Sequence, residues 1–169
     1  MEEIVNRVAK SPLVTLELEA YYHPGERILL DLKDVLFQGM ILREKDFREW
    51  AKNHDWSQYQ DKNLAVTCTA DAIIPTWAYM IIATKAEAYC NLLVQGDLDD
   101  LEMILFHNAI SNIDFESFKD KMVVVKGCSK VNVPASAYME VSRKLYPYVK
   151  SIMYGEPCST VPVYKKLKK

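Results

Sequence analysis

The feature that most constrains the fold is an internal repeat with a spacing of 59 residues. Without gaps, residues 55–97 align with residues 114–156. Eleven of the 43 aligned positions are identical, whereas about three are expected from average residue usage. The identical pairs are Asp55/Asp114, Asp61/Asp120, Lys62/Lys121, Val66/Val125, Pro75/Pro134, Ala78/Ala137, Tyr79/Tyr138, Met80/Met139, Lys85/Lys144, Tyr89/Tyr148 and Gly96/Gly155. The pattern indicates a duplicated β-α-β unit, and convergence of two ordinary units is the alternative.

Each copy predicts a strand, a helix and a second strand. The expected elements are strands at 64–68 and 122–126, helices at 76–89 and 135–149, and strands at 91–95 and 151–154. The first strands are apolar without strict alternation, which is typical of parallel strands covered on both faces. Pro75 and Pro134 stand near the helix starts, where a missing amide proton costs little.

The remaining segments predict how the copies join. Residues 98–109 have helical spacing after Asp97, a plausible N-cap, so a helix returns the chain for a parallel strand. We therefore expect an α/β three-layer sandwich whose core is one four-stranded, mostly parallel sheet. The N-terminal residues 1–54 predict a β-hairpin, from 14–22 and 27–32, at the sheet edge, followed by an amphipathic helix at 44–54.

Composition indicates an ordinary globular protein. Of 169 residues, 50% are hydrophobic and 26% are charged, with a formal net charge of −2. A chain of this size can bury a core without disulfides, so we expect one domain over residues 1–169. The charge argues against nucleic-acid binding, and Met1–Arg7 lacks the features of a signal peptide. We expect a cytoplasmic protein without membrane association, ending in a solvated basic tail at 163–169.

Three of the four cysteines fall where a ligand site is expected. Cys68, Cys128 and Cys158 follow predicted strands, and ligands of parallel sheets bind beyond the carboxyl ends of the strands. Without secretory features, reduced thiols are expected. Three clustered thiols would suit zinc or an iron–sulphur cluster.

Other roles for the cysteines stay open. Small thiols also suit crowded strand ends as packing residues, and no Cys-x-x-Cys pair is present. Cys128 is the candidate for a nucleophilic thiol, because Lys126 and Lys130 flank it and would favour the thiolate.

Two carboxylates are further candidates. Asp71 is the only charged residue between Lys62 and Lys85, in a stretch that reads as buried, so it predicts either a helix cap or a catalytic or ligand group. Glu156 occupies the position equivalent to Asp97 and is a candidate cofactor ligand. The apolar residues 77–82 predict a covered helix or a homodimer contact. Common nucleotide-binding and hydrolase motifs are absent from the sequence.

Four runs carry a family resemblance. They read REKDFR at 43–48, HDWSQY at 54–59, CTADAIIPTWAY at 68–79 and SIMYGEPCSTVP at 151–162. They resemble the bacterial domain-of-unknown-function family 2480, and the resemblance spans essentially the whole chain. It implies no established activity or catalytic residue, and it implies an association with sulphur mobilisation and iron–sulphur assembly proteins.

Three functions are compatible with these observations. The first is an accessory factor of iron–sulphur, metal or sulphur metabolism that uses Cys68, Cys128 and Cys158. The second is a non-catalytic, homodimeric interaction module whose cysteines only pack. The third is a thiol-dependent enzyme centred on Cys128.

Overall fold

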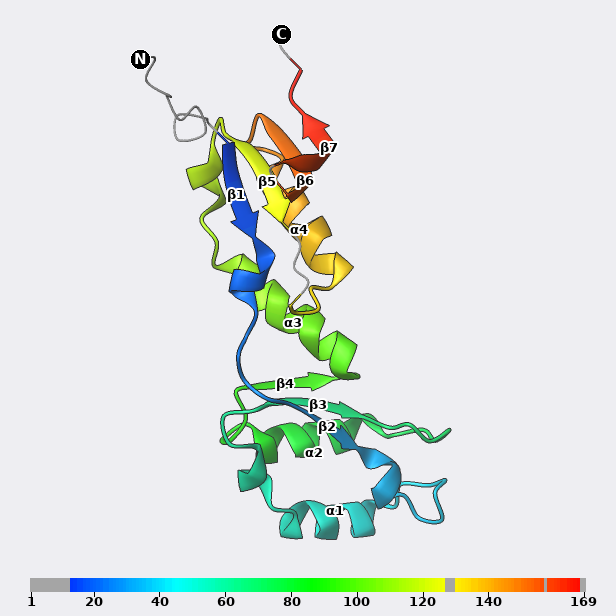
Figure 1. Cartoon of the computed structure of the whole chain (residues 1–169). Helices are drawn as coiled ribbons and strands as arrows, with labels where there is room; N and C mark the ends of the chain where they lie inside the picture. The colour runs from blue at the N-terminus through cyan, green and yellow to red at the C-terminus, as the bar shows by residue number, and fades with distance from the viewer. Residues whose placement is uncertain (1–12, 127–129, 157, 168–169) are drawn as a thin grey trace, which may run out of the picture. The chain divides into compact units, whose positions relative to one another are not determined.

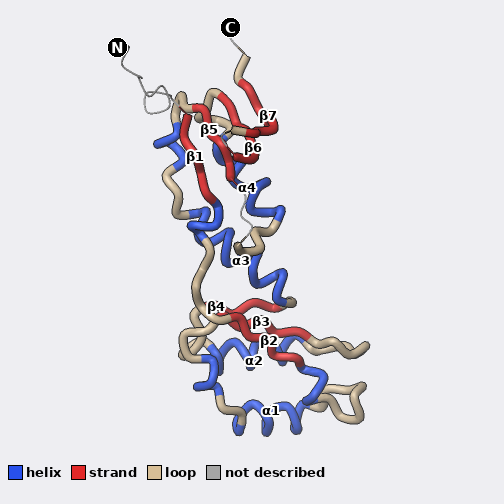
Figure 2. Tube along the Cα trace, viewed as in Figure 1, coloured by secondary structure: helices blue, strands red, loops and turns tan. Residues whose placement is uncertain are grey.

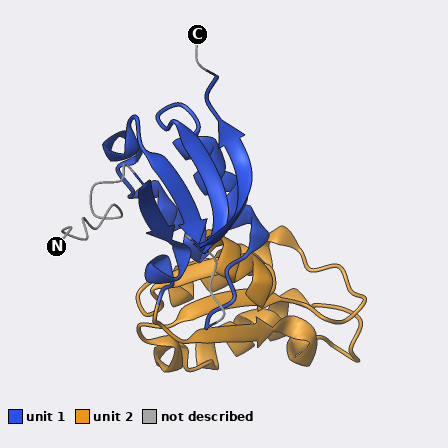
Figure 3. Cartoon of the chain, turned by 45° about the horizontal axis from the view of Figure 1, so that its top comes forward, with its two compact units in different colours: residues 1–23, 105–169 blue, residues 24–104 orange. Residues whose placement is uncertain are grey.

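The computed structural model describes residues 13–126, 130–156 and 158–167. The chain forms two compact units, which Figure 3 shows in two colours. Unit 1 takes residues 1–23 and 105–169, and unit 2 takes residues 24–104. Each unit is described by itself below.

Unit 2 is a three-stranded parallel sheet with its crossover helices. Its elements are β2 (Arg27–Asp31), α1 (Glu44–Asn53), β3 (Asn63–Thr67), α2 (Thr76–Ala86) and β4 (Leu92–Gln95). The strand order is β2-β3-β4, and both pairings are parallel. Figures 1 and 2 show that α1 connects β2 to β3 and that α2 connects β3 to β4.

The core of unit 2 lies on one face of this sheet. Leu64 and Val66 of β3 pack with Phe47 of α1 and Ile82 of α2, and all four side chains are at most 2% exposed. Ala65 of β3 points to the opposite face, because side chains alternate along a strand, and it is fully buried as well. The central strand is therefore covered on both faces, as parallel sheets require.

Unit 1 contains a four-stranded sheet. Its elements are β1 (Leu13–Glu17), β5 (Met122–Lys126), α4 (Ala135–Leu145), β6 (Ser151–Glu156) and β7 (Ser159–Lys165). The order is β1-β5-β6-β7, in which only β7 is antiparallel to its neighbour. The helix α3 (Leu98–Ser111) begins in unit 2 and ends in unit 1. Short 3-10 helices complete the chain at Leu18–Tyr21, Leu32–Val35, Trp56–Tyr59 and Phe115–Phe118.

The core of unit 1 repeats the plan of unit 2. Val123 and Val125 of β5 join a cluster with Val141 of α4 and Phe106 of α3. Val124, which points to the other face, is 0% exposed. Each unit is thus organised around a central strand that is buried on both faces.

Positions related by 59 residues also have matching local structure. Asp55 and Asp114 both have φ of −77°, and each side chain accepts a hydrogen bond from the amide two residues later. Asp61 and Asp120 both have positive φ, of 59° and 61°, and each amide donates to a tyrosine carbonyl at 2.9 Å. A duplication predicts this correspondence, and common descent of the copies stays a prediction.

The predicted N-terminal hairpin is wrong. β1 pairs in parallel with β5, and β2 pairs in parallel with β3, so the two strands belong to different sheets. A hairpin of two strands has little hydrophobic cover of its own, whereas each strand here lies beside a buried central strand. The turn sequence at 23–26 favours a hairpin locally, but pairing with the distant strands β5 and β3 is more stable.

The α/β class and the mostly parallel pairing are confirmed, but the expected single four-stranded sheet is two sheets. Both repeats pair their own strands as predicted, β3 with β4 and β5 with β6. However, β3 already has β2 and β4 on its two edges, and β5 has β1 and β6. Both edges of each central strand are already paired, so β3 and β5 cannot pair with each other and each repeat forms its own sheet.

The ends of several elements differ from the expectation. The helices expected to reach residues 89 and 149 end at Ala86 and Leu145. The predicted basic tail at 163–169 is in part a strand, since β7 continues to Lys165. No helix in the described part of the chain is long and apolar enough to cross a membrane.

Replacing Gly155 with alanine should destabilise unit 1. Gly155 has φ of +120°, and a Cβ built on it would lie 2.6 Å from the carbonyl oxygen of Ser159. We expect Gly155→Ala to lower the free energy of unfolding by about 1–3 kcal/mol in urea denaturation. Gly39→Ala is the control, because Gly39 also has positive φ but no atom of the described residues lies within 4 Å of the place that its Cβ would take. Equal losses in the two variants would contradict the steric explanation.

Candidate functional site

The cysteines predicted to gather do not follow strands of one sheet. Cys68 follows β3 in unit 2, whereas Cys158 lies in the turn between β6 and β7 in unit 1. Cys128 lies outside the described residues. The expectation that their loops meet assumed a single sheet, and that assumption is wrong. A shared site of the three cysteines stays a prediction.

The described cysteines are free thiols with different surroundings. Cys68 and Cys90 are half-buried, and Cys158 is exposed. The Sγ of Cys68 donates to the carbonyl oxygen of Ala70 at 3.7 Å. Burial raises the pKa of the Cys90 thiol, which keeps it protonated near neutral pH. Within residues 13–126, 130–156 and 158–167, no three His, Cys, Asp or Glu side chains are grouped to hold a metal ion.

Asp71 does not lie in the buried surroundings that its neighbours predicted. Its side chain is exposed in the loop between β3 and α2, and Ile73 in the same loop is 91% exposed. The apolar residues of this loop led to a wrong prediction of burial.

The predicted cap at Asp97 is confirmed, because its Oδ1 accepts hydrogen bonds from the amides of Asp99 and Asp100 at 2.9 and 3.0 Å.

Glu156 takes part in an exposed charge cluster at the end of β6. Its carboxylate lies 3.5 Å from Nζ of Lys126, which lies 3.7 Å from the carboxylate of Glu17 on β1. The charges of Glu156 and Glu17 raise the pKa of Lys126. These contacts link the ends of three neighbouring strands. A cofactor-binding role of Glu156 stays a prediction.

A cavity that the sequence did not predict lies between α2 and β4 in unit 2. This α2–β4 pocket has a volume of about 290 Å³. Its lining is mainly apolar and comes from β3, α2 and β4: Val66, Thr76, Tyr79, Met80, Ile82, Ala83, Leu93, Val94 and Gln95. The pocket thus accounts for part of the apolar run at 77–82.

The pocket also has polar groups from Tyr79 and Gln95. Burial raises the pKa of Tyr79, and the nearby Cys68 adds to the increase, whereas a side-chain hydrogen bond with Gln95 opposes it. The phenol therefore stays protonated at neutral pH and serves as a hydrogen-bonding group. An apolar cavity with a few polar groups is the usual form of a binding site.

Unit 1 has a cavity at the equivalent place, between α4 and β6. This α4–β6 pocket measures about 280 Å³. Six lining positions of the two pockets are related by the 59-residue offset: Val66/Val125, Tyr79/Tyr138, Ala83/Ser142, Leu93/Ile152, Val94/Met153 and Gln95/Tyr154. The linings also differ: Thr76, Met80 and Ile82 line the unit 2 pocket without equivalents in unit 1, and Val163 of β7, on the outer side of β6, lines the unit 1 pocket. Because the lining residues are mostly ordinary core types, only the comparison of the repeats could have indicated the pair.

Comparison with known families gives the chain its classification. Residues 2–166 match the family described as Protein of unknown function (DUF2480). The chain belongs to this family. The comparisons with curated proteins and with solved structures found no match. The description of the DUF2480 family gives no activity and no iron–sulphur role, so the residues of the site carry the functional argument.

In this DUF2480 chain, Asp31 organises the carboxyl ends of β2 and β3. Its carboxylate accepts hydrogen bonds from the Thr69 hydroxyl at 2.6 Å, from the Thr69 amide at 3.1 Å and from the Lys33 amide at 3.0 Å. Partial burial acts to raise the pKa of Asp31, but these hydrogen bonds outweigh it and hold the pKa at about 2. The loop after β3 is therefore tied to β2 by an ionised carboxylate.

Removal of the Thr69 hydroxyl should raise the pKa of Asp31. Because the folded-state pKa is lowered to about 2, the carboxylate stabilises the fold above its unfolded pKa of about 4, and this stability is lost as the pH falls through the folded pKa. We expect Thr69→Val to move the pKa of Asp31 toward its usual value in an NMR titration of the carboxyl carbon. Thr69→Ser, which keeps the hydroxyl, should leave it low. The same low pKa in Thr69→Val would contradict this account.

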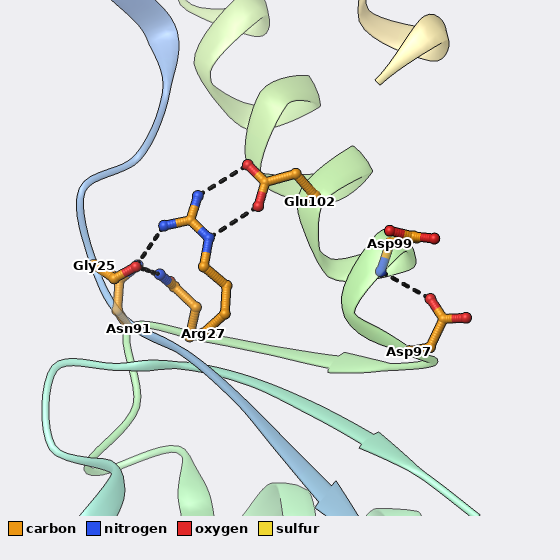
Figure 4. A network of polar contacts seen from close by, with 7 residues as sticks. Gly25, Arg27, Asn91, Asp97, Asp99 and Glu102 are labelled. Atoms are coloured by element: carbon orange, nitrogen blue, oxygen red, sulfur yellow. Dashed lines mark hydrogen bonds and ion pairs between the residues drawn. The ribbon is translucent and has the colours of Figure 1, made fainter. Parts of the chain in front are cut away.

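A buried polar network joins the amino ends of the unit 2 strands to α3. Asn63 is 0% exposed, accepts a hydrogen bond from Asn91 at 2.7 Å and donates to the carbonyl of Gly25 at 3.2 Å. Arg27 contacts both carboxylate oxygens of Glu102 at 2.9 Å, as Figure 4 shows. The first turns of α3 thus cover the sheet face opposite α1 and α2. Sequence could not reveal this network, because its members are up to 75 residues apart.

Loss of the Glu102 carboxylate should destabilise unit 2. The side chains of Arg27 and Glu102 are only 13% and 15% exposed, so Glu102→Ala removes the carboxylate from a largely buried guanidinium. We expect a loss of about 2 kcal/mol in the free energy of unfolding, measured in urea. The exposed pair of Arg48 and Glu44 gives the control, since Glu44→Ala should cost less than about 1 kcal/mol. Equal costs would show that the buried pair adds no particular stability.

Proposed function

We propose that this DUF2480 chain is a non-catalytic interaction module that holds an apolar side chain of a partner protein in the α2–β4 pocket. One observation supports it above others. The equivalent pocket in unit 1 has the chain's own Val163 at its outer side, whereas all described residues that line the unit 2 pocket belong to β3, α2 and β4. A partner side chain would take the place in unit 2 that Val163 takes in unit 1.

The size and chemistry of the pocket favour a side chain over a cofactor. A volume of about 290 Å³ is at the lower limit of the roughly 300–1,000 Å³ typical of small-molecule sites. The walls from Leu93, Ala83 and Ile82 supply apolar contact, and among the residues that the structure describes no charged side chain lines the cavity. Tyr79 and Gln95 can hydrogen-bond to the peptide groups that flank an apolar side chain.

The test fills the pocket while leaving its counterpart unchanged. The probe is N-acetyl-L-valine N-methylamide, titrated into the full chain while methyl NMR signals of Ala83, Leu93 and Val94 are followed. We expect saturable shifts at these methyls in the wild type. Ala83→Phe, which occupies the pocket, should weaken binding by about tenfold or more. The matched control is Ser142→Phe, at the equivalent position in the α4–β6 pocket, and it should leave binding unchanged.

Two outcomes would overturn the proposal. The first is the absence of saturable shifts at the unit 2 methyls in a well-folded wild-type protein. The second is equal weakening by Ala83→Phe and Ser142→Phe, which would show that the probe does not distinguish the two pockets.

A further inference from the structure

The outer edges of the two sheets differ at equivalent strands. In unit 1, β6 pairs on its outer side with β7, in antiparallel direction. In unit 2, β4 is the equivalent of β6, and within the described part of the chain no strand pairs with its outer side. The repeat therefore contains one edge that the chain completes itself and one that it does not.

The backbone of β4 presents hydrogen-bonding groups at this edge. The amide of Gly96 donates inward to the carbonyl of Val66 on β3 at 3.0 Å. Because successive residues of a strand direct their peptide groups to alternate sides, those of Leu93 and Gln95 point outward. Their equivalents in unit 1 are Ile152 and Tyr154, the residues that stand opposite Tyr164 and Val161 of β7.

The apolar pocket lies beside this outer edge of β4. Leu93 and Gln95 line the α2–β4 pocket, and Met80 of α2, also in its lining, is 64% exposed. In unit 1 the strand that completes the edge also supplies Val163 to the pocket. Backbone edge and apolar pocket thus lie together in unit 2, as they do where β7 binds.

We infer that an extended segment of a partner protein adds to β4 as an antiparallel strand and places a branched apolar side chain in the α2–β4 pocket. This inference rests on the proposed function and specifies how the partner binds. The partner's chemistry is that of β7, Ser159–Lys165, in which valines alternate with other residues. Strand addition supplies backbone hydrogen bonds for affinity, and the pocket supplies specificity.

A second copy of the chain fits the site less well through its own β4. In a β4–β4 pair, the side chains directed toward the pocket side are Leu93 and Gln95, and these already line the wall of their own pocket. Neither is free to enter the facing pocket. A partner strand must therefore bring its own apolar side chain.

The experiment uses the peptide acetyl-Ser-Thr-Val-Pro-Val-Tyr-Lys-amide, the sequence of β7, with the full chain. We expect saturable binding in fluorescence anisotropy and slower hydrogen exchange at the amides of Leu93 and Gln95. Protection at Ile152 and Tyr154 alone would mean that the peptide affects only the β6 edge, and it would overturn the inference.

Substitution at Gln95 separates the backbone from the side chain. Gln95→Pro removes an outward N–H, which an edge strand tolerates, and should weaken peptide binding by about tenfold or more. Gln95→Ala also loses the side-chain hydrogen bond but keeps the N–H, so it should bind the peptide several-fold more tightly than Gln95→Pro. Equal binding by both variants, with native amide spectra, would overturn strand addition.

The two proposals fail in distinguishable ways. If N-acetyl-L-valine N-methylamide binds the pocket but the peptide protects no β4 amide, the pocket function stands and strand addition is wrong. If neither probe binds, the proposed function is wrong as well. Concentration-dependent dimerisation that Gln95→Pro abolishes in the absence of peptide would show that a second copy occupies the edge, and would overturn the inference of a partner strand.

Discussion

Each unit depends on one central parallel strand that is buried on both faces and paired on both edges. In β3 and β5, three consecutive residues of each strand are at most 3% exposed. Full burial of a valine or leucine side chain contributes about 1.5–3 kcal/mol, so these short strands hold a large share of the hydrophobic stabilisation. A strand of this kind requires a neighbour on each side and cover on each face. The parallel partners and the crossover helices satisfy that requirement within each unit.

The same constraint explains where the two units differ. Once the central strand is paired on both edges, the outermost strands decide what a sheet can still bind. Unit 1 continues past β6 with β7, whereas unit 2 continues past β4 with a capped helix that begins at Leu98. The buried polar network is also specific to unit 2, because Met122 and Lys150 stand where unit 2 has Asn63 and Asn91. The copies share a core and differ at their edges, and the candidate site lies at such an edge.

The cysteine hypothesis shows how far a site can be inferred from a predicted topology. Cys68 and Cys158 do follow strands, as the sequence indicated. Their convergence required the two repeats to share a sheet, and no local pattern reports which edges of a strand are occupied. For the α2–β4 pocket, the sequence showed that residues 77–82 are apolar but did not predict a cavity. A cavity depends on how side chains from three elements pack against one another. Its polar residues, Tyr79 and Gln95, carried no motif.

By itself the sequence determined the repeat, its strands and helices within a few residues, the cap at Asp97 and the parallel direction of pairing inside each copy. These features follow from hydrophobic periodicity and from proline and capping preferences, which act over a few neighbouring residues. Only the tertiary structure decided that β1 and β2 join different sheets and that Arg27 meets Glu102. It also decided that the outer edge of β4, which no described strand pairs with, lies beside a pocket. Those outcomes depend on competition among distant strands for the edges of two buried central strands, and that competition is settled by packing of the whole chain.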